Sequence, residues 1–157
     1  ALGLVLIYIT FRFQWRQGIA AIITLLHDVM VVVGIFSIFD KEFTLPVIAA
    51  LLTVVGYSLN DTIVIFDRIR ENISKFRKRE LLPLINQSVT ETLSRTLLTS
   101  GTTLMVVLAL VFLGGEIIHD FAFALLVGVL IGTYSSIYVA SPTVLWLTKI
   151  APPKTSD

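Results

Sequence analysis

The sequence predicts an all-α protein, a polytopic bundle of transmembrane helices with one truncated span and four full spans. Two observations support this class: apolar residues make up 55% of the chain against 15% for charged residues, and the mean hydropathy is +0.89. Such values are typical of membrane proteins. The chain contains no cysteine, which excludes disulfides, thiol catalysis and cysteine-ligated zinc. With only two histidines as well, we expect no metal site and no cofactor.

The first apolar run, 1–10, is too short to cross a membrane. A helix of that length covers ~15 Å, whereas the hydrocarbon core of a bilayer is ~30 Å thick. The run lacks an initial Met, a basic stretch and a small-residue cleavage site, so it does not match a secretory signal. We interpret it as the end of a truncated helix, and the chain as a fragment.

Four longer apolar stretches follow, each near the ~20 residues that a transmembrane helix needs. They are 18–39, 43–66, 95–113 and 121–148. The last is long enough to tilt or to run past the membrane surface. We therefore assign 1–150 to one helix bundle and 151–157 to a tail.

The only sizeable polar segment, 67–94, connects the second full span to the third. Pro83 separates a basic run from a moderately amphipathic stretch, which we expect to lie along the membrane surface. The connections 40–42 and 114–120 are short, which predicts tight hairpins between antiparallel helices.

Basic residues indicate the orientation, because Lys and Arg are retained on the cytoplasmic side. Ten of them gather in the first connection, the segment 67–94 and the tail: Arg12, Arg16, Arg68, Arg70, Lys75, Arg77, Lys78, Arg79, Lys149 and Lys154. The two hairpins hold only Lys41 against four acidic residues. We therefore predict that the C-terminus is cytoplasmic and that the hairpins lie outside.

Three ionisable residues enter the apolar spans: Asp28, Asp61 and Arg95. A charge at such depth costs ~2.5 kcal/mol or more and usually serves a function. Each has polar neighbours at helical spacing, which puts them on one face. These neighbours are Thr24 and His27 for Asp28; Thr53, Gly56, Tyr57 and Asn60 for Asp61; and Thr99, Thr102 and Thr103 for Arg95. The two polar faces in the second and third full spans predict that Asp61 and Arg95 pair.

Structural roles are the alternative for each of these residues. Arg95 can reach the headgroups by snorkelling from its helix end, and Asp61 can be a buried, hydrogen-bonded acid. A membrane histidine such as His27 is more often a packing residue than a ligand. The run from Arg68 to Arg79 then serves as a topology signal, with binding of lipid headgroups as a weaker addition.

Small residues recur at every fourth position of the last span. They are Ala124, Gly128, Gly132, Ser136 and Ala140. This pattern predicts a groove in which another helix packs closely. Such a groove would also permit sliding between helices.

Three segments resemble the SecF family of bacterial protein-export proteins, which is similar in architecture to the RND exporters. The longest is Gly-Tyr-Ser-Leu-Asn-Asp-Thr-Ile-Val at 56–64, followed by Asp-Arg-Ile-Arg-Glu-Asn at 67–72. The others are Thr-Leu-Ser-Arg-Thr at 92–96, which runs into Thr-Ser-Gly-Thr-Thr at 99–103, and His-Asp at 27–28. The resemblance covers essentially the whole chain as a C-terminal membrane part. A first transmembrane helix and a periplasmic domain would precede it.

The resemblance implies a proton-coupled transport subunit of the bacterial inner membrane rather than an enzyme. SecF pairs with SecD and uses the proton-motive force to help draw preproteins out of the SecYEG channel, with SecA and YajC as further partners. In this family, the acid of the Asn-Asp-Thr segment and the arginine of the Arg-Thr segment are associated with proton passage. Here these are Asp61 and Arg95, with Thr99 one turn beyond. Membrane lipid is an implied partner and nucleic acid is not.

Other classes remain open at this point. An RND-type proton-coupled exporter of lipids or small molecules would use the same intramembrane charges, and the signature at 56–72 is the main reason to prefer protein export. An intramembrane protease fits poorly, because Ser58 lies outside a nucleophile elbow and has no evident His partner. A passive assembly module would tolerate neutralisation of Asp61, whereas a transporter would not.

Overall fold

The computed structural model describes residues 15–76 and 80–150, and these residues form helices and no strand. In chain order the elements are α2 (Trp15–Ile38), α3 (Leu45–Lys75), α4 (Leu81–Leu113), α5 (Glu116–Ser135), the π-helical turn η1 (Ser136–Ala140) and α6 (Ser141–Ile150). The predicted truncated span and tail lie outside the described residues, as do Arg12, Arg77, Lys78, Arg79 and Lys154. The all-α prediction is confirmed.

Four helical segments are long and apolar enough to cross a membrane: α2, α3, α4 and the continuous run from α5 through η1 to α6. The chain is thus a multi-pass membrane protein. α3 contains 31 residues, which is ~46 Å at ~1.5 Å per residue and exceeds a core of ~30 Å. Its polar end must therefore extend beyond the hydrocarbon.

The prediction for the polar segment was wrong in one respect. We expected a surface stretch after Pro83, but these residues form the beginning of α4, which runs unbroken from Leu81 to Leu113. Pro83 lies in the first turn, where a backbone N–H has no intrahelical acceptor, so the proline does not interrupt the helix. The last span likewise begins earlier than predicted, at Glu116.

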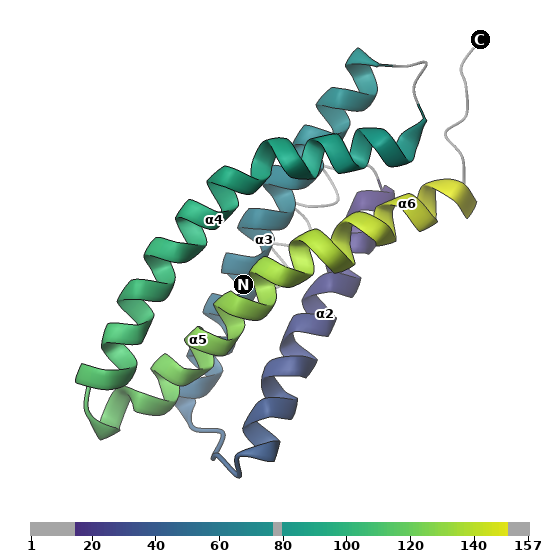
Figure 1. Cartoon of the computed structure of the whole chain (residues 1–157). Helices are drawn as coiled ribbons and strands as arrows, with labels where there is room; N and C mark the ends of the chain where they lie inside the picture. The colour runs from purple at the N-terminus through teal and green to yellow at the C-terminus, as the bar shows by residue number, and fades with distance from the viewer. Residues whose placement is uncertain (1–14, 77–79, 151–157) are drawn as a thin grey trace.

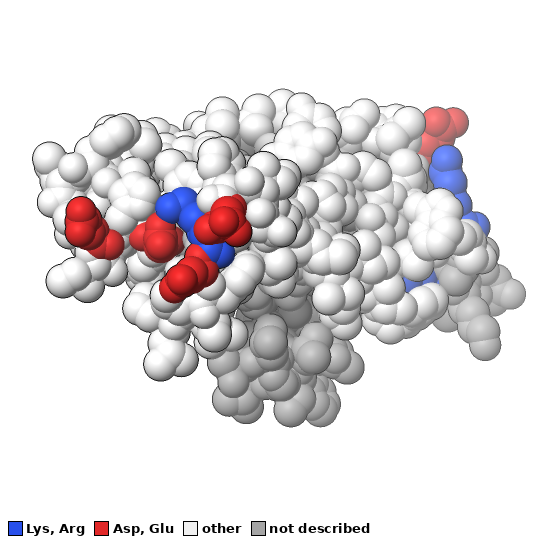
Figure 2. Space-filling model, turned by 90° about the horizontal axis from the view of Figure 1, so that it is seen from below, with Lys and Arg blue, Asp and Glu red and all other residues white. Residues whose placement is uncertain are grey.

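Both short hairpins lie at one end of the bundle (Figure 1). The α2–α3 hairpin turns at Asp40 with a φ of 50°, and the α4–α5 hairpin turns at Gly115 with a φ of 75°. We call this the acidic end, because it carries Asp40, Glu42, Glu116 and Asp120. Figure 2 shows acidic side chains gathered there. We call the opposite end, where α3 ends and α4 begins, the basic end.

α5 lies in the middle of the bundle and contacts α2, α3 and α4 (Figure 1). α4 is the most exposed span: 17% of its most apolar window is buried, against 39% to 44% in the other three. Its outward face is thus available to lipid or to another protein.

Two apolar clusters fill the interior on either side of a polar layer. The cluster toward the acidic end includes Val32 and Phe36, and the cluster toward the basic end includes Leu25 and Phe66. Between them, α2 contributes buried Asp28, and α3 and η1 contribute buried hydroxyl side chains. Because apolar residues enclose this layer on both sides, its polar side chains must find their hydrogen-bond partners within the protein.

Candidate functional site

Asp28 lies in the polar layer with both carboxylate oxygens in contact with a polar neighbour. The side chain is fully buried. Its Oδ2 accepts a hydrogen bond from Ser58 Oγ at 2.5 Å, and its Oδ1 lies 3.1 Å from His27 Nδ1. A carboxylate only accepts, so the His27 tautomer that suits this contact carries a hydrogen on Nδ1. The arrangement ties α2 to α3.

Asp61 is buried as well, with 3% of its surface exposed, but its surroundings differ. Its Oδ2 has no hydrogen-bond partner among the described residues. The Ser100 hydroxyl and the positive charge of Arg95 are the neighbouring groups that act on this carboxyl. An ionised carboxylate with an open oxygen is costly in a medium of low polarity, because nothing replaces the lost water.

Arg95 is exposed and lies beside a cavity of ≈ 350 Å³ between α3 and α4. The lining comprises Val64, Asp67, Arg68, Glu71, Glu91, Thr92 and Arg95. Arg95 thus interacts with Asp61 while its side chain borders a cavity lined mainly by charged residues. Of the predicted relay residues, the structure brings Arg95 and Asp61 within electrostatic range.

The threonines after Arg95 do not reach Asp61 through hydrogen bonds. Thr99 Oγ1 donates to the Arg95 carbonyl at 3.0 Å, Thr102 Oγ1 to the Leu98 carbonyl at 3.0 Å, and Thr103 Oγ1 to the Thr99 carbonyl at 2.9 Å. Each hydroxyl hydrogen is therefore used within α4 itself, a common arrangement for Ser and Thr inside helices.

The polar face of α3 is divided between the interior and the surface. Tyr57 is half-buried, and its hydroxyl donates to Ser100 Oγ at 3.2 Å. Thr53, Gly56 and Asn60 are exposed. The polar stripe predicted around Asp61 thus lies at the edge of the bundle, beside α4.

The buried face of α4 is one that the sequence interpretation missed. It consists of small hydroxyl residues at every fourth position: Ser88, Thr92, Thr96 and Ser100. The face that we predicted, with Arg95 and Thr99, lies next to it and is exposed. A four-residue repeat of Ser and Thr is the signal that could have identified this packing face.

The small residues of α5 and η1 pack against α3. A Cβ atom added at Gly128 would overlap the side chain of Val54, and one at Gly132 would lie 3.1 Å from Ser58 Cβ. Ser136 Oγ and Thr62 Oγ1 form a hydrogen bond of 3.0 Å. α3 and α5 approach each other closely at the level of the polar layer, as small residues allow.

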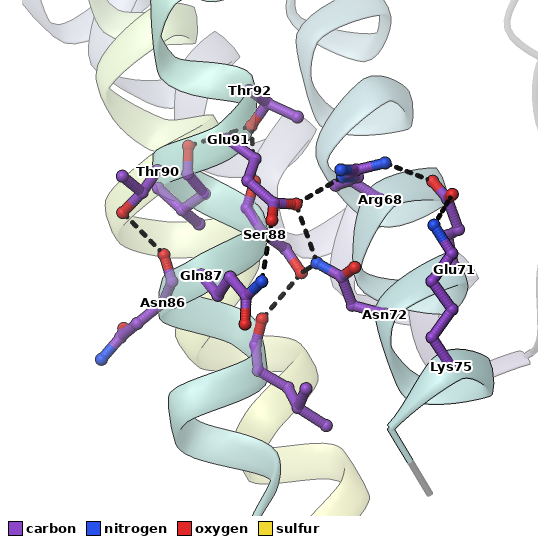
Figure 3. A network of polar contacts seen from close by, with 12 residues as sticks. Arg68, Glu71, Asn72, Lys75, Asn86, Gln87, Ser88, Thr90, Glu91 and Thr92 are labelled. Carbon is purple, nitrogen blue, oxygen red and sulfur yellow. Dashed lines mark hydrogen bonds and ion pairs between the residues drawn. The ribbon is translucent and has the colours of Figure 1, made fainter. Parts of the chain in front are cut away.

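A second polar network joins α3 to α4 at the basic end, beyond the apolar part of either helix (Figure 3). Glu91 accepts from Arg68 Nε at 2.5 Å, Gln87 Nε2 at 2.8 Å and Asn72 Nδ2 at 3.1 Å. Asn72 also donates to Ser88 Oγ at 2.9 Å. The Asn72 amide, then Gln87 and Arg68, lowers the pKa of Glu91 from 4.5 to about 2. This acid stays ionised at neutral pH.

A contact between the two hairpins holds the acidic end together. Lys41 Nζ lies 2.5 Å from Asp120 Oδ1 and 5.1 Å from the centre of the Phe123 ring. The hydrogen bond from Lys41 lowers the pKa of Asp120. Lys41 therefore links the α2–α3 hairpin to the beginning of α5.

Comparisons with known proteins agree with this architecture. The family model described as protein export membrane protein SecD/SecF, C-terminal, matches residues 1–150. SecF of Vibrio alginolyticus is 57% identical, over 91% of this chain and 45% of that protein. SecDF of Thermus thermophilus is 54% identical, over 92% of this chain and 20% of that protein. A crystal structure of SecDF in a super-membrane-facing form has a TM-score of 0.89 and 53% identity, over 95% of this chain and 20% of that one.

The chain belongs to the SecD/SecF family. The resemblance found in the sequence is thereby confirmed. The chain spans about half the length of the SecF relatives, as with 45% for Vibrio alginolyticus and 53% for Pseudomonas aeruginosa. These SecD/SecF relatives carry further segments, so the description here concerns only the part of them that this chain matches.

Proposed function

We propose that this chain is the membrane part of a SecF translocase subunit that, together with SecD, uses the proton-motive force to assist preprotein translocation. Relatives at 50% identity or more that are named protein translocase subunits support the general role. The observation that carries the proton-coupled role is the buried Asp61 carboxyl, which has one open oxygen and lies within range of Arg95.

Such a pair suits a proton switch for physical reasons. Burial favours the neutral form of a carboxyl group, while a nearby guanidinium favours the ionised form. A small change in the distance between Arg95 and Asp61, or in the hydration of the cavity beside Arg95, therefore shifts the balance. Moving one charge through the membrane potential yields ~2.3 kcal/mol per 100 mV, which is enough to bias two conformations.

The partners follow from the same assignment. The SecDF relative carries both parts in one chain, which favours association with SecD. SecYEG with SecA and YajC, and preproteins in transit, complete the proposed assembly. The basic end would face the cytoplasm and the acidic end the exterior, because Lys and Arg are retained inside.

The test is translocation into membrane vesicles, with and without a proton gradient, by the full-length protein with its partners. Asp61→Asn keeps the volume and removes the titrating group, so the complex should assemble normally and lose gradient-dependent export. Glu42→Gln is the matched control, because it removes an exposed carboxylate at the acidic end. Gradient-dependent export that survives in Asp61→Asn would contradict the proton-switch role and leave Asp61 as a structural acid.

A further inference from the structure

Ser100 lies where three helices meet. It is 3% exposed and belongs to α4. Its Oγ lies 3.2 Å from Tyr57 OH on α3 and 2.7 Å from Thr133 Oγ1 on α5. It is also near enough to the Asp61 carboxyl to interact with it. One small hydroxyl on α4 thus touches both α3 and α5.

The direction of each hydrogen bond follows from the number of hydrogens available. A hydroxyl group carries one hydrogen, and Thr133 donates its own to the Val129 carbonyl at 2.8 Å. With the Thr133 hydrogen used in this way, Ser100 is the donor in its bond with Thr133. Tyr57 in turn donates to Ser100. The chain of donation runs from Tyr57 through Ser100 to Thr133.

This direction determines what Ser100 can offer to Asp61. While its hydrogen points to Thr133, Ser100 can only accept from a protonated Asp61. An ionised Asp61 needs donors, and its Oδ2 has none among the described residues. Rotation of the Ser100 hydroxyl would supply one, but the bond to Thr133 would then be lost.

We propose that Ser100 is a positioning residue whose hydroxyl donates to Thr133 when Asp61 is protonated and turns to Asp61 when Asp61 is ionised. This inference rests on the proposed function and adds a route by which the protonation state reaches α5. The ionised state lacks one hydrogen bond between α4 and α5, so this contact is looser than in the protonated state.

The groups around Asp61 favour a change in hydrogen bonding that follows the protonation of Asp61 itself. α4 contributes Arg95. α2 contributes Asp28, which is bound to Ser58 one turn before Asp61 on α3, and His27, whose Nδ1 lies 3.1 Å from Asp28 Oδ1. At this level α5 and η1 present the hydroxyl groups of Thr133 and Ser136. Asp61 is therefore the acid beside the hydroxyl chain that links α4 to α5.

Spin labels can measure the contact directly: this chain contains no cysteine, and any cysteine elsewhere in the full-length protein or its partners is replaced by serine before labelling. Leu108→Cys on α4 and Leu130→Cys on α5 replace side chains that are 39% and 50% exposed. In the full-length protein with its partners in liposomes, the distance distribution between the labels should change with pH. Ser100→Ala and Thr133→Val should abolish this change, and Thr133→Ser, which keeps the hydroxyl, should retain it.

The same labels in Asp61→Asn should show one distribution at every pH. A pH-dependent change that persists in Ser100→Ala, or that is absent from the wild type, would overturn the inference. Export is measured in parallel on the unlabelled variants. If Asp61→Asn exports normally while the label distance still depends on Asp61 and Ser100, the proposed function fails and the inference about Ser100 stands.

Discussion

The interface between α3 and α4 contains two acidic side chains in different surroundings. At the basic end, Glu91 accepts hydrogen bonds from three side chains, Arg68, Gln87 and Asn72. Inside the apolar part of the bundle, the Oδ2 of Asp61 has no partner among the described residues. The two acids belong to neighbouring helices: Glu91 on α4 lines the cavity that Arg95 borders, and Asp61 on α3 lies within electrostatic range of the same Arg95.

The difference shows how one helix pair can be fixed at one level and responsive at another. A carboxylate with a full set of donors keeps its charge and fixes the helices that supply those donors. A buried carboxyl that lacks such donors is not held in its charged form, so its protonation can follow the position of a nearby charge such as that of Arg95. We infer that the network at the basic end holds α3 against α4, while the region around Asp61 and Ser100 changes state.

The largest expected effect separates the two arginines that border the same cavity. Arg95→Ala should reduce gradient-dependent export to the level seen without a gradient, because it removes the charge that acts on Asp61. Arg68→Ala should leave the gradient dependence intact, because Arg68 binds Glu71 and Glu91 instead. Vesicle translocation with and without a proton gradient, normalised to the amount of assembled protein, measures both.

If Arg95→Ala and Arg68→Ala lose gradient dependence equally, the region around Asp61 does not differ in function from the network at the basic end. Arg95→Lys sharpens the test. It keeps the charge but loses the guanidinium geometry, so export that is restored by lysine would assign the effect to charge alone.

The next effect concerns the side of α3 that faces α5. Gly128→Ala should lower the free energy of unfolding by ~1–3 kcal/mol, because the added methyl group overlaps Val54 and overpacks the interface. Gly34→Ala is the matched control, since no atom lies within 4 Å of its Cβ position. Unfolding of the full-length protein in mild detergent gives both values.

Val54→Ala added to Gly128→Ala should recover part of the lost stability, because it opens room for the methyl group. If the two glycine variants lose equal stability, the close approach of α3 and α5 at this level is not what holds α3 in place. The network at the basic end would then be the contact that fixes α3.

Length and hydropathy predicted the membrane spans, because a helix that crosses lipid must be apolar for about twenty residues. They did not predict where α3 ends or where α4 begins. Beyond the hydrocarbon, a helix continues for as long as side-chain partners support it, and such a partnership links Asn72 to Ser88. Contacts of this kind depend on how α3 and α4 face each other, and a local sequence pattern does not predict that orientation.

The candidate site was predictable in part for a similar reason. The depth of Asp61 singled it out, since a carboxyl group in a span is rare and costly. The partner face of α4 was assigned to the wrong side because Ser and Thr satisfy their hydroxyls within their own helix, as Thr99 does. They are therefore tolerated toward lipid and toward protein alike. Only the packing distinguishes Ser100 from Thr99.

The smallest expected effect concerns Glu91, the acid that accepts hydrogen bonds from three side chains. In the folded protein the pKa of Glu91 is lowered from 4.5 to about 2, and the hydrogen bond from Asn72 is the largest cause. A depressed folded pKa means that the stabilisation is fully present above the unfolded value and is lost as the pH falls through about 2. The thermal midpoint of the wild type should thus fall between pH 4.5 and the most acidic usable buffer, and Glu91→Gln should flatten part of this fall. Because Glu91 is exposed, the difference in thermal midpoint between the wild type and Glu91→Gln should shrink at high salt.

Glu71 and Asp120, whose pKa values are also lowered, contribute to the remaining dependence of the thermal midpoint on pH. Glu42→Gln should parallel the wild type, and a Glu91→Gln curve that does the same would show that Glu91 adds no pH-dependent stability to the α3–α4 hairpin.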